Sequence, residues 1–364
     1  MTERTAQSDL LYSETEDDLR AAVRSLLADR AGHPQLLGRI ESDSPYVPGL
    51  WKALAGDMGA AGLLVPEKLG GQGASHREAA VVLEELGRAV TPAPYLTSAV
   101  VATETLLALA GESTSAAELL AGLASGRTVA VLAVPLSASP YAEPSVAATV
   151  TGVADAGAAD VLLVSRADGL YAVPAAEATV EPQIPLDLTR PLARVTAEAG
   201  SGTRLAGPDA AAAAVRRGLL AGAGLLASEQ LGLAEWCLEE TVRHTRERHQ
   251  FNRPVGSFQA LKHRMAQLWL DVVGARAAAR AAADALATGS PDAPLTVAVA
   301  QAYCSKVAVR AAEECVQLHG GIGMTWEHPA HLALKRAKSD QLALGSAGRH
   351  QDAIAALVDL PAPA

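Results

Sequence analysis

Residues 246–266 read RERHQFNRPVGSFQALKHRMA, and this stretch decides the fold. It holds both phenylalanines of the chain, Phe251 and Phe258. Its cationic side chains are Arg246, Arg248, Arg253, Lys262 and Arg264. The NRPVG turn is followed by apolar residues at i, i+4, i+7 and i+11, namely Leu261, Met265, Leu268 and Val272. That spacing places one apolar stripe along a helix. The stretch therefore predicts two long helices joined by a turn that gathers rings and cations.

The composition favours a mainly helical globular protein. Hydrophobic residues make up 49 % of the 364 residues but aromatic ones only 3 %. Buried volume must therefore come from Leu, Val and the strong helix former Ala. The net charge of -10 repels phosphate polymers and anionic lipid surfaces, so neither nucleic acid nor a membrane is expected as a partner. A basic cluster on this background points to a local anion site, with a solvated helix face as the open alternative.

Cysteine usage and the N-terminus indicate a cytoplasmic protein. The three cysteines are Cys237, Cys304 and Cys315. Their odd number and wide spacing disfavour a disulfide framework or a zinc ribbon. The N-terminal residues contain no apolar signal segment, and the Ala-rich run from residue 210 is interrupted by Arg216 and Arg217.

The chain divides into three regions that differ in their pattern of apolar and turn residues. Residues 1–125 are expected to form a helical domain, which includes a capping box at 13–16 (SETE). Short β-rich runs with turn residues predict a small β-domain at 126–205, and 197–209 reads as a flexible exit. The helical period then returns over 206–364, in segments at 209–247, 257–287, 294–318 and 328–357. Four such segments joined by short breaks predict a four-helix bundle.

The order of these regions, together with three motifs, resembles the acyl-CoA dehydrogenase family over nearly the whole chain. The first motif is WKALAGDMGAAGLLVPEKLGGQGASHREAAVVLEELGRA at 51–89. The second is the opening stretch at 246–266, and the third is CVQLHGGIGMTWEHPAHLALKRAK at 315–338. The resemblance implies an N-terminal helical domain, a barrel-like middle β-domain and a C-terminal four-helix bundle.

The resemblance also implies a reaction. Enzymes of this family move the α-hydrogen of an acyl-CoA to a glutamate as a proton, while a hydride passes from the β-carbon to FAD. The reduced flavin then passes its electrons to an electron-transfer-flavoprotein-like acceptor. The flavin performs the redox chemistry, and the protein supplies placement and electrostatics.

The matching motifs imply contacts to an FAD bound by a neighbouring subunit. A guanidinium can hold a pyrophosphate by charge-assisted hydrogen bonds, and Arg248 takes this role by motif position. The other implied cofactor-binding residues are Gln250, Phe251, Gln259, Gln317, His319, Gly320 and Gly321. The alternatives are a surface arginine, ordinary bundle packing of the phenylalanines, and a helix stop at Gly320.

The catalytic base of the family is missing. Its two possible positions fall on Leu344 and Gly222, so no catalytic residue is assigned. Asp340 and Glu229 lie a few residues away, but helical geometry turns each to a different face. Glu327 reads as a structural residue or as a charge at a helix N-terminus.

The β-domain departs from the family as well. The Thr-Glu-Pro to Gly-Ser-Asp loop and the Trp-Ile-Thr/Ser strand, which contact the flavin ring in relatives, are absent. We therefore expect a degenerate, β-type subunit that completes the FAD site of a catalytic partner in an α2β2 tetramer acting in fatty acid or steroid breakdown. The alternatives are a non-catalytic scaffold or acyl-CoA-binding subunit, and a homotetrameric flavoenzyme with an unrecognised base.

Other chemistry is weakly supported. His328 and His331 offer two imidazoles, but a zinc site needs three or four ligands and no carboxylate or thiol is expected to join them. No metal is therefore expected. A GxSxG elbow of a hydrolase is absent, and the Gly-rich loop at 66–73 lacks the Lys-Ser/Thr of a phosphate-binding loop.

Overall fold

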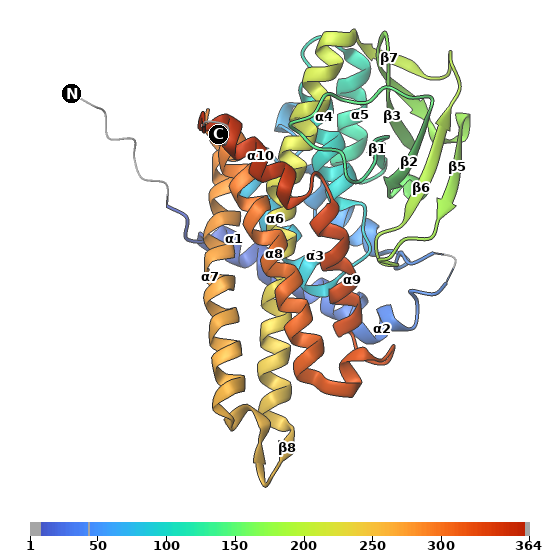
Figure 1. The fold of residues 1–364 in the computed structure, drawn as a ribbon. Helices are drawn as coiled ribbons and strands as arrows, with labels where there is room; N and C mark the ends of the chain where they lie inside the picture. Colours follow the sequence, from blue (N-terminus) through green and yellow to red (C-terminus); the bar gives the residue numbers. More distant parts are fainter. Residues whose placement is uncertain (1–8, 43, 361–364) are drawn as a thin grey trace, which may run out of the picture.

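The computed structural model describes residues 9–42 and 44–360. It confirms the predicted fold class, with helices at both ends of the chain and a small β-region between them (Figure 1). The N-terminal helices are α1 (Glu14–Arg30), α2 (His33–Leu37), α3 (His76–Ala89), α4 (Thr103–Leu107) and α5 (Thr114–Ala124). The C-terminal helices are α6 (Pro208–Glu247), α7 (Gln259–Ala287), α8 (Ala293–His319), α9 (Ala330–Leu342) and α10 (Ala347–Leu357).

The capping box predicted at the first helix is present. The backbone N–H of Glu16 donates to Ser13 Oγ over 3.2 Å, and the Glu16 carboxylate accepts from the Ser13 backbone over 2.7 Å. A second box at Ser75 and Glu78 starts α3. Within the region predicted to be helical, Lys52–Asp57 and Tyr95–Ala102 are wound as π-helix rather than α-helix.

The β-region consists of two sheets. Its strands are β1 (Ala130–Leu132), β2 (Thr149–Ala154), β3 (Val161–Arg166), β4 (Gly169–Pro174), β5 (Ala178–Gln183), β6 (Leu192–Ala197) and β7 (Thr203–Ala206). One sheet has the order β1-β3-β4-β7 and the other β2-β6-β5. All pairs are antiparallel except β1 with β3. Valine, leucine and alanine side chains from both sheets form a shared core.

Strand β7 corrects the prediction. The exit at 197–209 was expected to be flexible, but β7 lies within it and pairs with β4. Gly202 makes this possible, because its φ of +75° suits glycine and its Cα approaches the β4 backbone too closely for a Cβ. Strand β5 lies in the predicted β-domain but lacks a clear apolar alternation, because the adjacent residues Glu181 and Pro182, which point to opposite faces, are both exposed.

The bundle contains α6, α7, α8 and α9, and α10 packs beside α8. The predicted segment 328–357 is therefore two helices rather than one. Leu344 and Gly345 separate them with φ values of +53° and +102°, and Ser346 caps α10. By length and composition α6 could cross a membrane. However, 67 % of its most apolar 18-residue stretch is buried inside the protein, as in a core helix.

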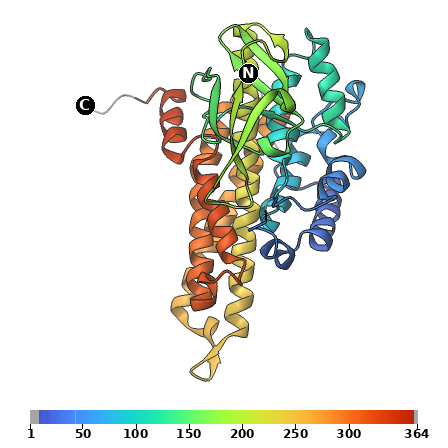
Figure 2. The ribbon, with the colours of Figure 1, turned by 90° about the vertical axis from the view of Figure 1, so that its right-hand side faces the viewer.

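Helix α3 packs tightly against the centre of α6. A Cβ on Gly87 would lie 2.1 Å from the Glu229 carbonyl oxygen, and a Cβ on Gly232 would lie 1.8 Å from the Glu84 carbonyl oxygen. Only glycine permits this approach, so the N-terminal helices are held directly on the bundle. The far end of the bundle, where α6 and α7 meet in a short hairpin, projects away from the β-region (Figures 1 and 2).

Candidate functional site

The projecting end of the bundle is built by the opening stretch of the sequence. Strands β8 (His249–Gln250) and β9 (Arg253–Pro254) form a two-residue hairpin over Phe251 and Asn252. Both turn residues have positive φ, +52° and +60°, as hairpins of this length require. The Phe251 ring is 85 % exposed. A bulky side chain in the left-handed region is strained, and such strain concentrates at functional sites.

A large open pocket lies beside this hairpin. Its volume is about 840 Å³, and it is lined by residues from both ends of the α6–α7 turn and from the end of α8. Seven of the eight predicted cofactor-binding residues line it: Arg248, Gln250, Phe251, Gln317, His319, Gly320 and Gly321. The eighth, Gln259, is exposed at the start of α7 and is not among the lining residues, although Phe258 and Ala260 are. We call this pocket and the hairpin the outer end.

Arg248 stands where an anion could be held. It is the first residue after α6, its backbone N–H donates to the His244 carbonyl over 2.9 Å, and its own carbonyl accepts from Val255 over 2.8 Å. The backbone is thus fixed while the guanidinium is exposed. Across the pocket, Gly320 ends α8 as its C-cap with φ +65°, as the helix-stop interpretation held. A Cβ on Gly320 or Gly321 would meet nothing within 4 Å, so this backbone faces open space.

His319 differs from the other predicted residues because its side chain is buried. Nδ1 lies 2.6 Å from the Cys315 carbonyl oxygen and donates to it, so Nε2 is the acceptor when the ring is neutral. The His319 ring lies between those of His244 and His328, at centroid distances of 4.2 and 4.4 Å. The Cys315 thiol and its carbonyl counteract burial and raise the pKa of His319, whereas burial lowers the pKa of His244 and His328.

A carboxylate completes this cluster. Glu240 Oε1 lies 3.7 Å from His319 Nε2 and 3.7 Å from His328 Nε2. The expectation that no carboxylate would stand near His328 is therefore wrong, whereas His331 lies apart with its ring against Trp326. Sequence reasoning missed Glu240 and His244. Their spacing of four residues from each other and from Arg248 puts all three on one face of α6, and that was the available signal.

The two positions expected for a catalytic base meet inside the molecule. Gly222 on α6 is buried, and a Cβ there would lie 2.5 Å from Val101 Cγ2 and 3.1 Å from Leu344 Cδ1. Leu344 is 4 % exposed, and its backbone N–H donates to the Leu136 carbonyl over 2.7 Å. Apolar side chains therefore occupy both positions.

The space around this contact is small. The adjoining cavity has a volume of about 30 Å³ and is lined by apolar side chains such as Leu96, Val101, Leu132, Leu219 and Leu344. That is room for about one water molecule, whereas ligand pockets generally measure ~300–1,000 Å³. Neither a flavin ring nor an acyl chain fits there in this structure.

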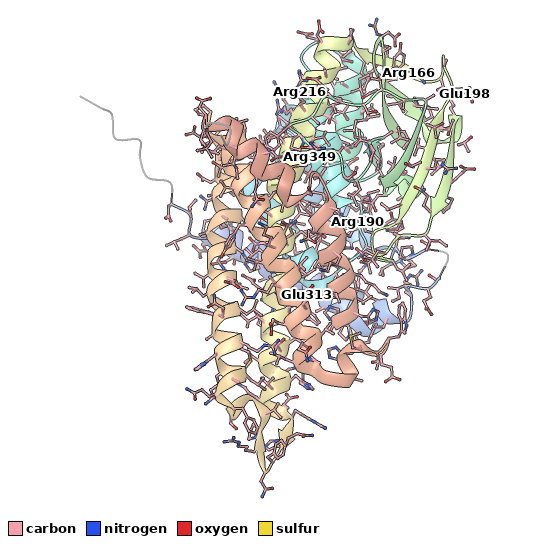
Figure 3. The ribbon with its side chains drawn as sticks, viewed as in Figure 1. Arg166, Arg190, Glu198, Arg216, Glu313 and Arg349 are labelled. Atoms are coloured by element: carbon pink, nitrogen blue, oxygen red, sulfur yellow. The ribbon has the colours of Figure 1, made fainter. Side chains whose placement is uncertain are left out.

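Asp340 and Glu229 belong to a buried ionic cluster beside this contact. Arg336 donates to Asp187 over 2.5 Å and to Glu229 over 2.6 Å, and Arg190 pairs with both Glu229 and Asp340. Burial alone would raise the pKa of Asp187 and Glu229, but the two arginines outweigh it and lower both pKa values. At Asp340, burial and then the charge of Glu229 raise the pKa to about 8. Figure 3 shows Arg190 where the β-region meets α9. We call this ionic cluster and the Gly222–Leu344 contact together the inner junction.

These groups bind one another and are not free to accept a substrate proton. The two arginines pair with Asp187 and Glu229, and the raised pKa of Asp340 favours its protonated form. The cluster ties the loop before β6 to α6 and α9, so Asp340 and Glu229 are structural residues here rather than replacements for the missing base.

The residues present fit one part of an FAD molecule. The outer end offers an exposed guanidinium and open glycine backbone, which suit a pyrophosphate and the adenosine half. The inner junction offers no room and no base for the flavin ring. The fit is therefore confined to the pyrophosphate and adenosine half of the cofactor.

Comparisons with known proteins match both helical domains of the chain to one family. The model of the acyl-CoA dehydrogenase N-terminal domain matches residues 13–127, and that of the acyl-CoA dehydrogenase C-terminal domain matches residues 212–358. A relative from Mycobacterium tuberculosis, acyl-CoA dehydrogenase IpdE2, is 37 % identical over 89 % of this chain and 91 % of its own. Its counterpart in Mycolicibacterium smegmatis is 36 % identical over 92 % of this chain and 95 % of its own.

The chain is also similar to solved structures over nearly its whole length. The ChsE4-ChsE5 complex from Mycobacterium tuberculosis contains a chain with TM-score 0.84 and 26 % identity, covering 98 % of this chain and all of that one. The Tcur3481-Tcur3483 steroid ACAD variant has TM-score 0.82 and 27 % identity over 95 % of this chain and 98 % of that one. With both domain families matched across most of its length, the chain belongs to the acyl-CoA dehydrogenase family of oxidoreductases.

Proposed function

We propose that this chain is the non-catalytic half of a heteromeric acyl-CoA dehydrogenase, and that its outer end completes an FAD site held mostly by a catalytic partner subunit. The observation that carries the proposal is the contrast between the two candidate sites in one chain. The outer pocket is open and lined by seven of the predicted cofactor residues, while the inner junction is closed and without a base.

At the outer end, Arg248 supplies a fixed positive charge for a pyrophosphate. A bidentate guanidinium–phosphate contact adds geometric specificity to the electrostatic attraction. Phe251 extends past the end of its own protomer with its ring 85 % exposed, and the Phe258 ring supports it edge-on at 6.0 Å. A strained and exposed ring of this kind is suited to packing on a partner subunit or its cofactor.

At the inner junction, this chain does not take part in proton abstraction. The family reaction needs a carboxylate near the α-carbon of the thioester, and the two positions hold Leu344 and Gly222. When bound, FAD would accept the hydride in the partner's site. The residues of this chain would hold and orient the cofactor there.

An exposed apolar face on the bundle supports a subunit interface. Large side chains on α7 and α8 remain exposed by 36–59 %: Trp269, Leu270, Val273, Val299 and Tyr303. The Tyr303 ring packs close to Gly274 of α7, so the two helices present these side chains together. Aromatic and apolar side chains grouped on a surface are typical of protein interfaces. The ChsE4-ChsE5 structure is a complex of two proteins, which supports a hetero-oligomer for this chain as well.

The proposed substrate is a bulky CoA thioester of steroid type, in fatty acid or steroid breakdown. The support is the steroid ACAD, which is 27 % identical over 95 % of this chain. Electron transfer to a flavoprotein-type acceptor is part of the same proposal. The partner subunit would determine the length and shape of the acyl group.

The test is co-expression with a catalytic acyl-CoA dehydrogenase subunit. The purified complex should be yellow and should reduce its flavin when acyl-CoA is added, whereas this chain alone should be colourless. Arg248→Ala should weaken FAD retention about 10- to 100-fold, which corresponds to the ~1.5–3 kcal/mol of a charged hydrogen bond. The matched control is Arg246→Ala, which removes an exposed arginine two residues away that does not line the pocket.

The other outcomes decide between the alternatives. Full flavin content in the Arg248→Ala complex would favour a scaffold or acyl-CoA-binding subunit that leaves the flavin site to its partner. A yellow lone chain that is reduced by acyl-CoA would favour an independent homotetrameric flavoenzyme. Equal loss of flavin in the Arg246→Ala and Arg248→Ala complexes would show a general charge effect rather than a phosphate contact.

A further inference from the structure

We propose that Glu240, His319 and His328 form a binding site for a divalent transition-metal cation of the zinc type. The three residues come from separate elements: α6, the end of α8, and the loop before α9. One ligand atom from each lies within 4.8 Å of the other two. The site adjoins the outer pocket through His319, which lines both, whereas Glu240 and His328 do not line that pocket.

The spacing of the ligand atoms suits tetrahedral coordination. Bonds of ~2.0–2.2 Å at tetrahedral angles place ligand atoms ~3.4 Å apart. Glu240 Oε1 lies 3.7 Å from each of the two Nε2 atoms. Contraction by a few tenths of an ångström would bring the carboxylate to this spacing from each imidazole, and the two Nε2 atoms, which lie within 4.8 Å of each other, would close onto the cation by rotation of the less buried His328 ring. Three protein ligands leave one coordination position for water.

His319 is prepared as a ligand. Its side chain is fully buried, and Nε2 has no hydrogen-bond partner among the described residues. A buried bare ring nitrogen is costly unless something binds it. Nδ1 donates to the Cys315 carbonyl, which fixes the ring and keeps the Nε2 lone pair available. A backbone carbonyl on the second nitrogen is the usual support of a metal-bound histidine.

Two contacts oppose binding and limit its strength. Arg243 donates through Nε to Glu240 Oε2 over 2.9 Å and through Nη2 to Oε1. A cation would displace the second contact and keep the first, since a carboxylate has about four lone-pair sites. The Ala330 backbone N–H lies 3.2 Å from His328 Nδ1, and coordination through Nε2 would move a proton to Nδ1 and break that contact.

The ligand set selects the cation. Two imidazoles and one carboxylate suit Zn²⁺ and Co²⁺, whereas Mg²⁺ and Ca²⁺ prefer oxygen ligands throughout. Cobalt is the useful probe because its visible absorption reports the coordination geometry. The experiment is a titration of the tag-free full chain with Co²⁺, followed by competition with Zn²⁺.

We expect saturable binding of one Co²⁺ per chain, with the intense visible bands of a tetrahedral site, and full displacement by Zn²⁺. His328→Gln and Glu240→Gln should each weaken binding at least ~100-fold, because loss of outer-shell partners alone costs ~10–100-fold. His331→Gln is the matched control, since it removes a half-buried imidazole three residues from His328 that lies outside the cluster.

Thermal unfolding of each metal-free variant shows whether it folds like the parent chain. The wild-type titration does not depend on any variant. Absence of saturable binding at micromolar Co²⁺ would overturn the proposal. So would unchanged affinity in both His328→Gln and Glu240→Gln, or equal loss in His331→Gln. None of these measurements involves FAD, so a negative result leaves the proposed function untouched.

Discussion

The inner junction and the outer end both contain arginines, but those of the inner junction are buried and paired, whereas that of the outer end is exposed. At the inner junction, Arg190 and Arg336 are each at most 5 % exposed and each pairs with buried carboxylates. At the outer end, Arg248 is exposed, and its guanidinium has no ion-pair partner among the described residues. The backbone around it is nonetheless firmly hydrogen bonded. The inner polar groups hold the chain together, and the outer ones remain available for another molecule.

Under the proposed function, this difference explains how a family site loses one half and keeps the other. A catalytic carboxylate in the interior is expensive unless it is used, because an unpaired buried charge destabilises the fold. Leucine at position 344 and glycine at position 222 avoid that cost, and the Val101 and Leu344 side chains fill the space beside Gly222. An exposed arginine that contacts a partner's cofactor costs little in the free chain. Selection can therefore retain it for assembly alone.

The largest expected effect is at Arg336. Arg336→Met leaves Asp187 and Glu229 buried without their main cation, and breaking a buried pair in this way costs about 3–5 kcal/mol. The measurement is the free energy of unfolding in urea. Arg349→Met is the control, because Arg349 is exposed on α10, where Figure 3 labels it. It should change stability by no more than ~0.5 kcal/mol. A loss below 1 kcal/mol for Arg336→Met would contradict a structural role for the cluster.

A smaller loss is expected from Leu344→Ala. Removing a buried leucine side chain costs about 2–5 kcal/mol, and the lower half of that range is expected because a small cavity already adjoins Leu344. Alanine keeps the Cβ, so the strain of the positive φ stays the same and the difference reports packing. Leu342→Ala, at a position 61 % exposed, is the control and should be nearly neutral. Similar losses at both positions would mean that the junction is not tightly packed.

Asp340→Asn tests the protonation of the cluster. Burial raises the pKa of Asp340 to about 8, so the folded state binds more protons than the unfolded chain, whose aspartate titrates near pH ~4. The contribution of Asp340 to stability is therefore present at low pH and is lost as pH rises from about 4 to 8. The Asp340→Asn variant lacks this pH-dependent contribution to stability. It should match wild type within ~1 kcal/mol at about pH 4 and become relatively more stable as the pH rises towards 8.

Unfolding curves of both proteins across this pH range check the sign. A difference that is flat with pH, or that favours wild type increasingly at high pH, would show that Asp340 is ionised in the fold. The balance of two arginines against Asp187 and Glu229 would then have to be revised.

Much of the fold could be predicted because its signals are local. The Ser13 capping box, the apolar stripe from Leu261 and the glycine after His319 each act within a few residues. The missed elements depend on distant partners. Strand β7 exists because Gly202 lets it approach β4, and the helix break at Leu344 is accompanied by the hydrogen bond from its backbone to Leu136.

The candidate site divides in the same way. The outer residues could be named because they lie in two continuous motifs. The proximity of Glu240 to His328, 88 positions apart, could not be deduced, because nothing in either local sequence records the packing of the loop before α9 on α6. Likewise, Asp340 and Glu229 could not be identified as ion-pair partners of Arg190 and Arg336. Pairing of buried charges depends on the tertiary fold.

The smallest expected effect concerns the strained turn of the outer end. Phe251 has φ +52°, and left-handed geometry in a residue other than glycine costs about 1–3 kcal/mol. Phe251→Gly relieves this strain but adds the backbone entropy of glycine in the unfolded state, about 0.4–1 kcal/mol. A net local gain between about 0 and ~2.6 kcal/mol should remain, seen as slower hydrogen exchange of the Val255 N–H that closes the hairpin.

Phe251→Ala separates the ring from the backbone, because alanine keeps the strain and loses only the aromatic contact. It should leave the exchange of Val255 nearly unchanged. If the exposed ring serves the proposed complex, both variants should lose FAD to the same extent when co-expressed with the partner, although only the glycine variant strengthens the hairpin. A glycine variant with a weaker hairpin would mean that the Phe251–Phe258 contact outweighs the strain. The turn would then be held by packing within this chain, and the exposed ring would no longer point to a partner.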